Sequence, residues 1–256
     1  MPVRSESLRE LMFGVPAQVV AVLSGLDDAP ADEAGRMIGD FVQCIPAGAT
    51  PQQQARAAEA AAALRELLGP ALAARGEGLL AELVRAAEPG TEPAALLANG
   101  IGLLSQTFDA TAGLIGNTLV TLGRQPEPAY RRPEALRAVV DEVARYEAPI
   151  QNTRRFAAAA MPVAGATLVP GDAVLVVLAA ANRDPAVNEA PDRFRPDRAD
   201  AAVFTFGAGA HGCPGRTIAA TIAAAVVGEL LAAGYEPADL GPIDYLPLAN
   251  ARIPAL

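Results

Sequence analysis

The sequence predicts a mainly α-helical fold with small β-sheets, an α+β architecture, in one domain spanning residues 1–256. Three observations predict it. Apolar residues recur at helical spacing through most of the first half of the chain, and the longest such stretch covers residues 94–122. Strand-like runs occur only in short pieces between residues 153 and 179. Hydrophobic residues make up 52% of the chain, which is enough for a sizeable core.

The first half, residues 1–125, is expected to be helical. Ser5 or Ser7 is a candidate cap for a short helix that ends before Gly14, and Pro16 precedes a second apolar run. The polar segment 27–34 is expected to be a connector. Gly69-Pro70 is expected to end an Ala-rich helix. The helices expected in this half are the Ala-rich helix at 52–68, a short helix at 79–87 and the long helix at 94–122.

The second half, residues 126–256, mixes short elements with loops. A helix over 134–146 is expected to end before Pro149. Strands are expected at 153–158, 167–169 and 173–179, with turns at Gly165 and at 170–172. The segment 182–198 is rich in Pro, Asp and Arg and is expected to be an ordered loop. A short apolar run at 202–206, a Gly-rich loop at 207–215 and a helix at 216–233 follow.

Composition excludes several classes of protein. The net charge is −9, which argues against a nucleic-acid partner because phosphate binding needs a basic face. The chain has two cysteines, Cys44 and Cys213, so a reduced, cytoplasmic setting is the simplest interpretation. The N-terminus lacks the long apolar run of a signal peptide, and no apolar stretch suits a bilayer. We therefore expect a cytoplasmic protein with no membrane or nucleic-acid partner.

The Gly-rich loop has two interpretations. Gly207, Gly209 and Gly212 match the spelling of a dinucleotide-binding fingerprint. That fingerprint needs a βαβ unit, and little chain remains after Gly215 to build one. In the other interpretation Cys213 is a thiolate ligand. It lies just before a helix, whose N-terminal dipole favours the thiolate. A zinc site has little support, because one His and two distant Cys do not complete four ligands.

The ten residues from Phe206 to Gly215 resemble the heme-binding signature of the cytochrome P450 family. The match covers every constrained position: Phe206, Gly207, Gly209, His211, Cys213, Pro214 and Gly215. The resemblance implies that the cofactor is heme b (iron protoporphyrin), with Cys213 as the iron ligand. It also implies that Phe206, Gly207, His211 and Gly215 bind the cofactor, His211 by reaching an acidic group on the macrocycle.

Upstream segments resemble the same family in the same order. Glu142 and Arg145 resemble its ExxR pair, and the segments 182–185 and 191–194 resemble the meander before the cysteine loop. The resemblance implies that Arg193 completes a Glu–Arg–Arg cluster that locks the loop. Arg155 matches the position that contacts a heme propionate, a role that suits the guanidinium fork.

The long helix resembles the oxygen-binding helix of the family. Asp109 takes the position of the acid, whereas Ala110 stands where the family has an alcohol, and Thr111 follows one place later. Gln106 and Thr107 replace small residues that open the oxygen groove. The resemblance implies that Asp109 and Thr111 are the catalytic residues, with proton delivery rearranged around Ala110.

The expected function is that of a heme-thiolate monooxygenase, an oxidoreductase acting on a small hydrophobic metabolite with O2. Electrons would come from an external ferredoxin or flavoprotein reductase, because no segment resembles a flavin or iron–sulfur module. The alternative is an auxiliary protein that stabilises a partner enzyme without oxygenase activity. We expect the family's N-terminal portion to be lacking, which leaves a strand edge open to a homodimer or partner chain.

Overall fold

Helices dominate the computed structural model, which describes residues 5–46, 48–74, 76–125 and 127–256. The helices of the first half are α1 (Ser5–Leu23), α2 (Asp28–Phe41), α3 (Pro51–Ala73), α4 (Leu79–Ala86) and α5 (Pro93–Arg124). Those of the second half are α6 (Pro133–Tyr146), α7 (Leu178–Ala181) and α8 (Arg216–Ala232). The expected helices at 79–87, 94–122, 134–146 and 216–233 are confirmed within two residues at either end.

The first two helices differ from the sequence prediction. One helix, α1, continues through Gly14 and Pro16, where we expected two. Ser7 therefore lies inside a helix, and the capping role suggested for Ser5 lies outside the described side chains. The polar segment 27–34, expected as a connector, forms the first half of α2. In α2, the side chains of Ala31, Ala34 and Ile38 are buried. Packing of this narrow apolar face stabilises the helix, although the polar composition of the segment did not predict one.

The Ala-rich helix α3 begins as predicted and ends later. Thr50 caps it, accepting from the Gln53 N–H at 3.2 Å, while the Gln53 side chain accepts from the Thr50 N–H at 2.9 Å. Pro70 lies inside the helix, which continues to Ala73. A proline here removes one N–H but does not end the helix, so Gly69-Pro70 was wrong as a stop signal.

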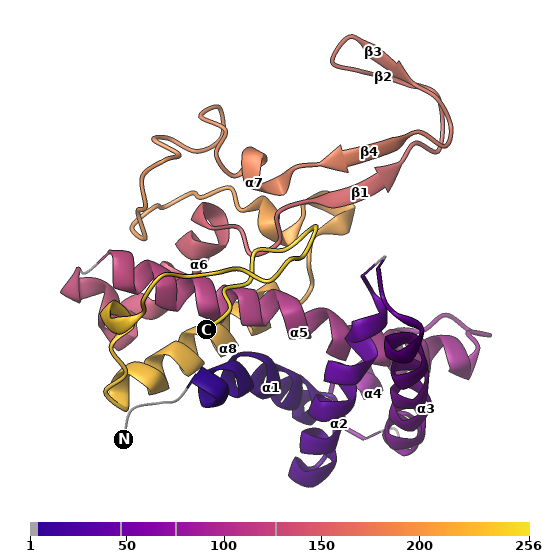
Figure 1. The fold of residues 1–256 in the computed structure, drawn as a ribbon. Helices are drawn as coiled ribbons and strands as arrows, with labels where there is room; N and C mark the ends of the chain where they lie inside the picture. Colours follow the sequence, from indigo (N-terminus) through magenta and orange to yellow (C-terminus); the bar gives the residue numbers. More distant parts are fainter. Residues whose placement is uncertain (1–4, 47, 75, 126) are drawn as a thin grey trace.

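Helix α5 is the centre of the fold. It packs against α1, α3, α6 and α8, and Figure 1 shows it crossing the helical body. Every residue from Thr111 to Leu122 is buried, and side chains such as Ile115, Leu119 and Leu122 are fully enclosed. Because this part of α5 is buried on all sides, close packing fixes its position relative to the helices around it.

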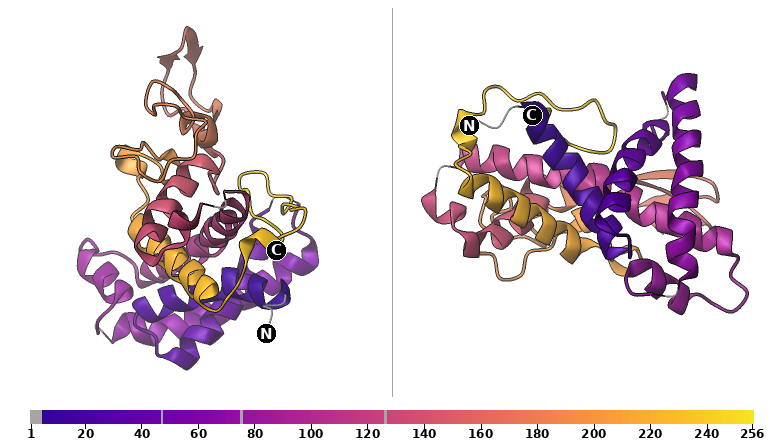
Figure 2. Two further views of the ribbon diagram at one scale, coloured as in Figure 1. Left: turned by 90° about the vertical axis from the view of Figure 1, so that its left-hand side faces the viewer. Right: turned by 90° about the horizontal axis from the view of Figure 1, so that it is seen from below.

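The β-structure consists of two small antiparallel sheets. β1 (Thr153–Phe156) pairs with β4 (Ala173–Val176), and β2 (Met161–Val163) pairs with β3 (Ala166–Leu168). The two sheets form an arm, residues 153–176, that projects away from the helices (Figures 1 and 2). The sequence prediction missed β2 and extended the last strand to residue 179, whereas β4 ends at Val176 and α7 begins at Leu178. Several apolar side chains of the arm are exposed, including Phe156 and Leu175.

No helix in the described ranges is long and apolar enough to cross a membrane.

Burial differs enough within this fold to give a stability test with one residue type. Leu119 is fully buried on α5, whereas Leu175 is 59% exposed on β4. We expect Leu119→Ala to lower the free energy of unfolding by about 2–5 kcal/mol through lost burial and the cavity it leaves. Leu175→Ala should cost less than about 1 kcal/mol. Urea denaturation followed by circular dichroism measures both, and equal losses would contradict the burial pattern.

Candidate active site

The Gly-rich loop holds Cys213 directly before α8. The Cys213 N–H donates to the Phe206 carbonyl at 2.7 Å, which closes the loop. Gly207 has a φ of 71°, and a β-carbon there would collide with the His211 carbonyl oxygen. Only glycine fits this position without distortion of the loop. The thiol of Cys213 is exposed, and α8 starts three residues later.

A cavity of about 340 Å³ separates this loop from α5. Four of the predicted site residues line it: Thr111, Phe206, Cys213 and Gly215. Asp109, Arg155, Gly207 and His211 do not belong to its lining. The structure therefore brings the thiol and the hydroxyl-bearing part of α5 to one cavity, from segments about a hundred residues apart in the sequence.

On the α5 side, the cavity is lined by Ala110 and Thr111 and also by Asn99, Gln106 and Thr107. The Thr111 hydroxyl oxygen is buried and has no hydrogen-bond partner among the described residues. Burial raises the pKa of the Asp109 carboxyl above its usual value, since desolvation disfavours the charged form. Asn99 was missed at the sequence level, although its helical spacing from Gln106 could have indicated it.

The two residues predicted to reach the acidic groups of a cofactor lie outside the cavity lining. Arg155, on β1, is exposed, and its Nη1 donates to Thr153 Oγ1 at 2.7 Å and to the Arg154 carbonyl at 2.9 Å. His211 lies exposed in the loop itself. Among the described residues, neither side chain makes a hydrogen bond to a buried partner.

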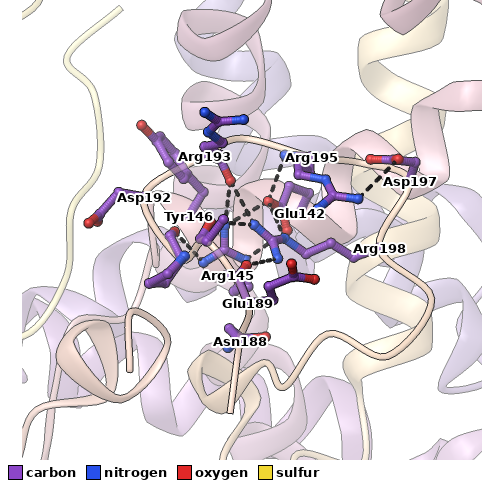
Figure 3. A network of polar contacts seen from close by, with 12 residues as sticks. Glu142, Arg145, Tyr146, Asn188, Glu189, Asp192, Arg193, Arg195, Asp197 and Arg198 are labelled. Carbon is purple, nitrogen blue, oxygen red and sulfur yellow. Dashed lines mark hydrogen bonds and ion pairs between the residues drawn. The ribbon is translucent and has the colours of Figure 1, made fainter. Parts of the chain in front are cut away.

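A buried ion pair on α6 bonds the segment 191–198 that precedes the cysteine loop (Figure 3). Arg145 donates to both carboxylate oxygens of Glu142, at 2.8 and 2.7 Å, and both side chains are almost fully buried. Its other N–H groups donate to the carbonyls of Asn182, Pro191 and Arg193, at 3.0, 2.8 and 3.1 Å. All five N–H donors of the guanidinium are therefore used.

The third side chain of the Glu–Arg–Arg cluster is Arg198, so the prediction of Arg193 is wrong. Arg198 Nε donates to Glu142 Oε1 at 3.1 Å, and its side chain is 8% exposed. Arg193 contributes only its carbonyl, which accepts from both arginines, while its side chain is exposed. The loop turns between the two positions, and this turn directs the later arginine inward.

The rival interpretations of the loop find no support. Both sheets are antiparallel pairs, so the described residues contain no βαβ unit for a dinucleotide. Nor does the described part of the chain contain a cluster of three or more His, Cys, Asp or Glu side chains suited to a metal ion.

Comparisons with known proteins agree with the resemblance. Residues 125–233 match the family model described as Cytochrome P450. The chain is 33% identical over 229 residues to Cytochrome P450 107B1 of Saccharopolyspora erythraea, covering 87% of this chain and 56% of that protein. It is 32% identical over 211 residues to 6-deoxyerythronolide B hydroxylase of the same bacterium, covering 80% and 52%.

Solved structures give the same result. The crystal structure of CalO2 superposes with a TM-score of 0.84 at 27% identity, covering 97% of this chain and 65% of that one. The chain belongs to the cytochrome P450 family, which confirms the predicted fold class. It spans about half the length of the curated relatives it matches.

Members of this family bind heme, and the residues at the cavity fit such a group. The cavity is mostly apolar, as a flat macrocycle requires, and it offers one soft sulfur ligand at Cys213. The buried hydroxyl of Thr111, without a partner in the described chain, also points to an occupant of this space.

The corrected cluster gives a second stability test. Arg198→Leu leaves the buried Glu142 carboxylate without one of its partners, and we expect a loss of about 3–5 kcal/mol in the free energy of unfolding. The matched control Arg193→Leu keeps the carbonyl that the cluster uses and should change stability by less than about 0.5 kcal/mol. Thermal and urea denaturation measure both. A larger loss for Arg193→Leu would restore the original assignment.

The buried carboxyl of Asp109 predicts a pH effect. Because its folded-state pKa is raised, the folded protein holds this proton more tightly than the unfolded chain does. Stability should therefore fall as the pH rises through the interval between the unfolded and folded pKa values. Asp109→Asn should remove this loss, so the stability of the variant relative to the native protein rises across that interval and is constant below and above it. Urea denaturation at a series of pH values measures it, and a constant difference would contradict it.

Proposed function

We propose that this chain is the heme-thiolate part of a monooxygenase that acts on a small hydrophobic metabolite. The observation that carries the proposal is the cavity in which Cys213 faces the Thr111 segment of α5. The chemistry that heme supplies when bound is activation of dioxygen, which a thiolate ligand favours. Electrons come from an external ferredoxin or flavoprotein reductase.

Each predicted cofactor-binding residue has a defined role in this proposal. Cys213, held just before the N-terminus of α8, binds the iron. Phe206 and Gly215 shape the wall beside the sulfur, and Gly207 permits the fold of the loop. Arg155 and His211 turn toward the carboxylates of the cofactor.

Protons reach the cavity along α5. The Thr111 hydroxyl can donate to a water or substrate atom, because no acceptor in the described chain occupies it. Asp109 exchanges protons with the exterior, and its raised pKa helps it to hold a proton between transfers. Ala110 contributes no donor, so Thr111 takes the role that an alcohol at that position would have.

The exposed β1 and β4 strands support a further part of the proposal, a homodimer or partner chain at this sheet. The core that α5 shares with α1, α6 and α8 supports treating residues 1–256 as one cytochrome P450-like domain.

The absorption spectrum of the reduced protein tests the proposal. We expect the purified protein to contain heme and to show, with carbon monoxide, the Soret band of a thiolate–carbonyl complex. Cys213→Ala should abolish this band because it removes the sulfur ligand. Cys44→Ala is the matched control and should leave the band unchanged, since Cys44 does not line the cavity.

Two results would contradict the proposal. A protein that neither purifies with heme nor takes it up would favour the auxiliary role. An unchanged band in Cys213→Ala would refute the assignment of the ligand.

A further inference from the structure

The segment 249–254 lies antiparallel to residues 149–151, which lie between α6 and β1. The Arg252 N–H donates to the Pro149 carbonyl at 2.8 Å, and a second main-chain bond of 2.8 Å and an antiparallel bridge at Ile150 accompany it. Pro149 and Ile150 both line the cavity. Main-chain hydrogen bonds therefore tie the position of this part of the cavity wall to the position of the segment 249–254.

One face of α5 contacts this segment at two glycines. A β-carbon at Gly113 would lie 3.2 Å from Pro149 Cβ and 3.4 Å from the Arg252 carbonyl oxygen. A β-carbon at Gly116 would lie 3.1 Å from Pro254 Cδ. The two glycines therefore let α5 approach the segment and the cavity wall more closely than larger residues would allow.

A single side chain of α5 bonds the segment directly. Asn117 is fully buried, and its Nδ2 donates to the Arg252 carbonyl at 2.7 Å. Its neighbour Thr118 is also fully buried, but the Thr118 hydroxyl donates within the helix, to the Leu114 carbonyl. Of the side chains of α5, only Asn117 makes a hydrogen bond to a described residue outside the helix.

The buried carboxamide of Asn117 is an expensive group for packing alone. Its Oδ1 has no hydrogen-bond partner among the described residues, and burying an unpaired polar atom costs free energy. An apolar side chain would fill the position at lower cost. The hydrogen bond to Arg252 is therefore the feature that distinguishes Asn117 from an ordinary core residue.

We infer that Asn117 is a positioning residue for the cavity. It does not line the cavity, but its hydrogen bond holds the segment 249–254 against α5. The segment in turn holds Pro149 and Ile150 through its main chain. The room between α5 and this wall therefore depends on one buried hydrogen bond outside the cavity. The inference goes beyond the proposed function, and only its heme readout rests on that function.

Hydrogen exchange at the amides of Gln151 and Arg252 tests the inference without any cofactor. Asn117→Leu removes the donor, so both amides should exchange about fivefold faster relative to the amides of α8, which is the effect of one net hydrogen bond. Asn117→Ala removes the same donor without added bulk and should give the same result. Thr118→Val is the matched control, because it removes a buried hydroxyl of the next residue and leaves both amides at their native relative rate.

The absorption spectrum of the heme-loaded protein measures the room beside the wall. Imidazole and 4-phenylimidazole shift the Soret band by binding iron through the same kind of nitrogen, but they differ by a phenyl ring. The quantity compared is the ratio of the Kd of imidazole to the Kd of 4-phenylimidazole.

Two variants should change this ratio in the same direction. Asn117→Leu releases the wall, and Gly113→Ala pushes Pro149 outward with its new β-carbon. Each should raise the ratio about tenfold, the lower end of what the space of one methylene group contributes in an apolar pocket. Thr118→Val should leave the ratio unchanged.

Three results would overturn the inference: unchanged exchange at Gln151 and Arg252 in Asn117→Leu, an equal acceleration in Thr118→Val, or faster exchange with an unchanged ratio. A protein that takes up no heme refutes the proposed function instead. The exchange rates then decide about Asn117 by themselves, because the Gln151 amide belongs to residues 149–151 of the wall segment.

Discussion

The buried pair of Glu142 and Arg145 is the interaction on which the site depends. Its carboxylate and guanidinium come from one turn of α6, yet most of their bonds reach beyond that helix. Burying two charges costs free energy that an ion pair alone rarely recovers. Here the guanidinium is fully satisfied and the carboxylate also accepts from the Arg195 N–H and from Arg198. The pair therefore serves to fix one path for an otherwise irregular loop.

From this pair, hydrogen bonds lead to the cysteine. Asn182, whose carbonyl accepts from Arg145, bonds the Phe204 N–H at 2.6 Å and the Thr205 hydroxyl at 2.9 Å. Thr205 in turn donates to the Ala144 carbonyl of α6 at 2.6 Å. The next residue, Phe206, accepts from the Cys213 N–H. The thiol is thus exposed but anchored through a buried polar network, which is how a loop can hold a ligand rigidly.

The sequence predicted those features that depend on interactions between residues close together in the chain. Helices α4, α5, α6 and α8 and the cysteine-loop motif were predicted from the sequence, because hydrophobic spacing and short motifs act over a few residues. The prediction missed features that depend on distant contacts. α2 forms because Ala31, Ala34 and Ile38 are buried against the rest of the fold. Arg198 rather than Arg193 turns inward because the loop turns between the two positions. Nothing in the sequence near Arg193 distinguishes the two arginines.

The position of Thr111 shows what a one-residue shift does to a site on a helix. Successive residues point about 100° apart, so a hydroxyl at Thr111 does not point where one at Ala110 would. Yet Ala110 and Thr111 both line the cavity, and the Thr111 side chain is nearly fully buried. A hydroxyl there is held between the core of α5 and the cavity. Because this hydroxyl has no acceptor among the described residues, it is available to donate to a ligand in the cavity. The move of the hydroxyl from position 110 to Thr111 therefore changes the direction of the donor but still leaves a donor at the cavity.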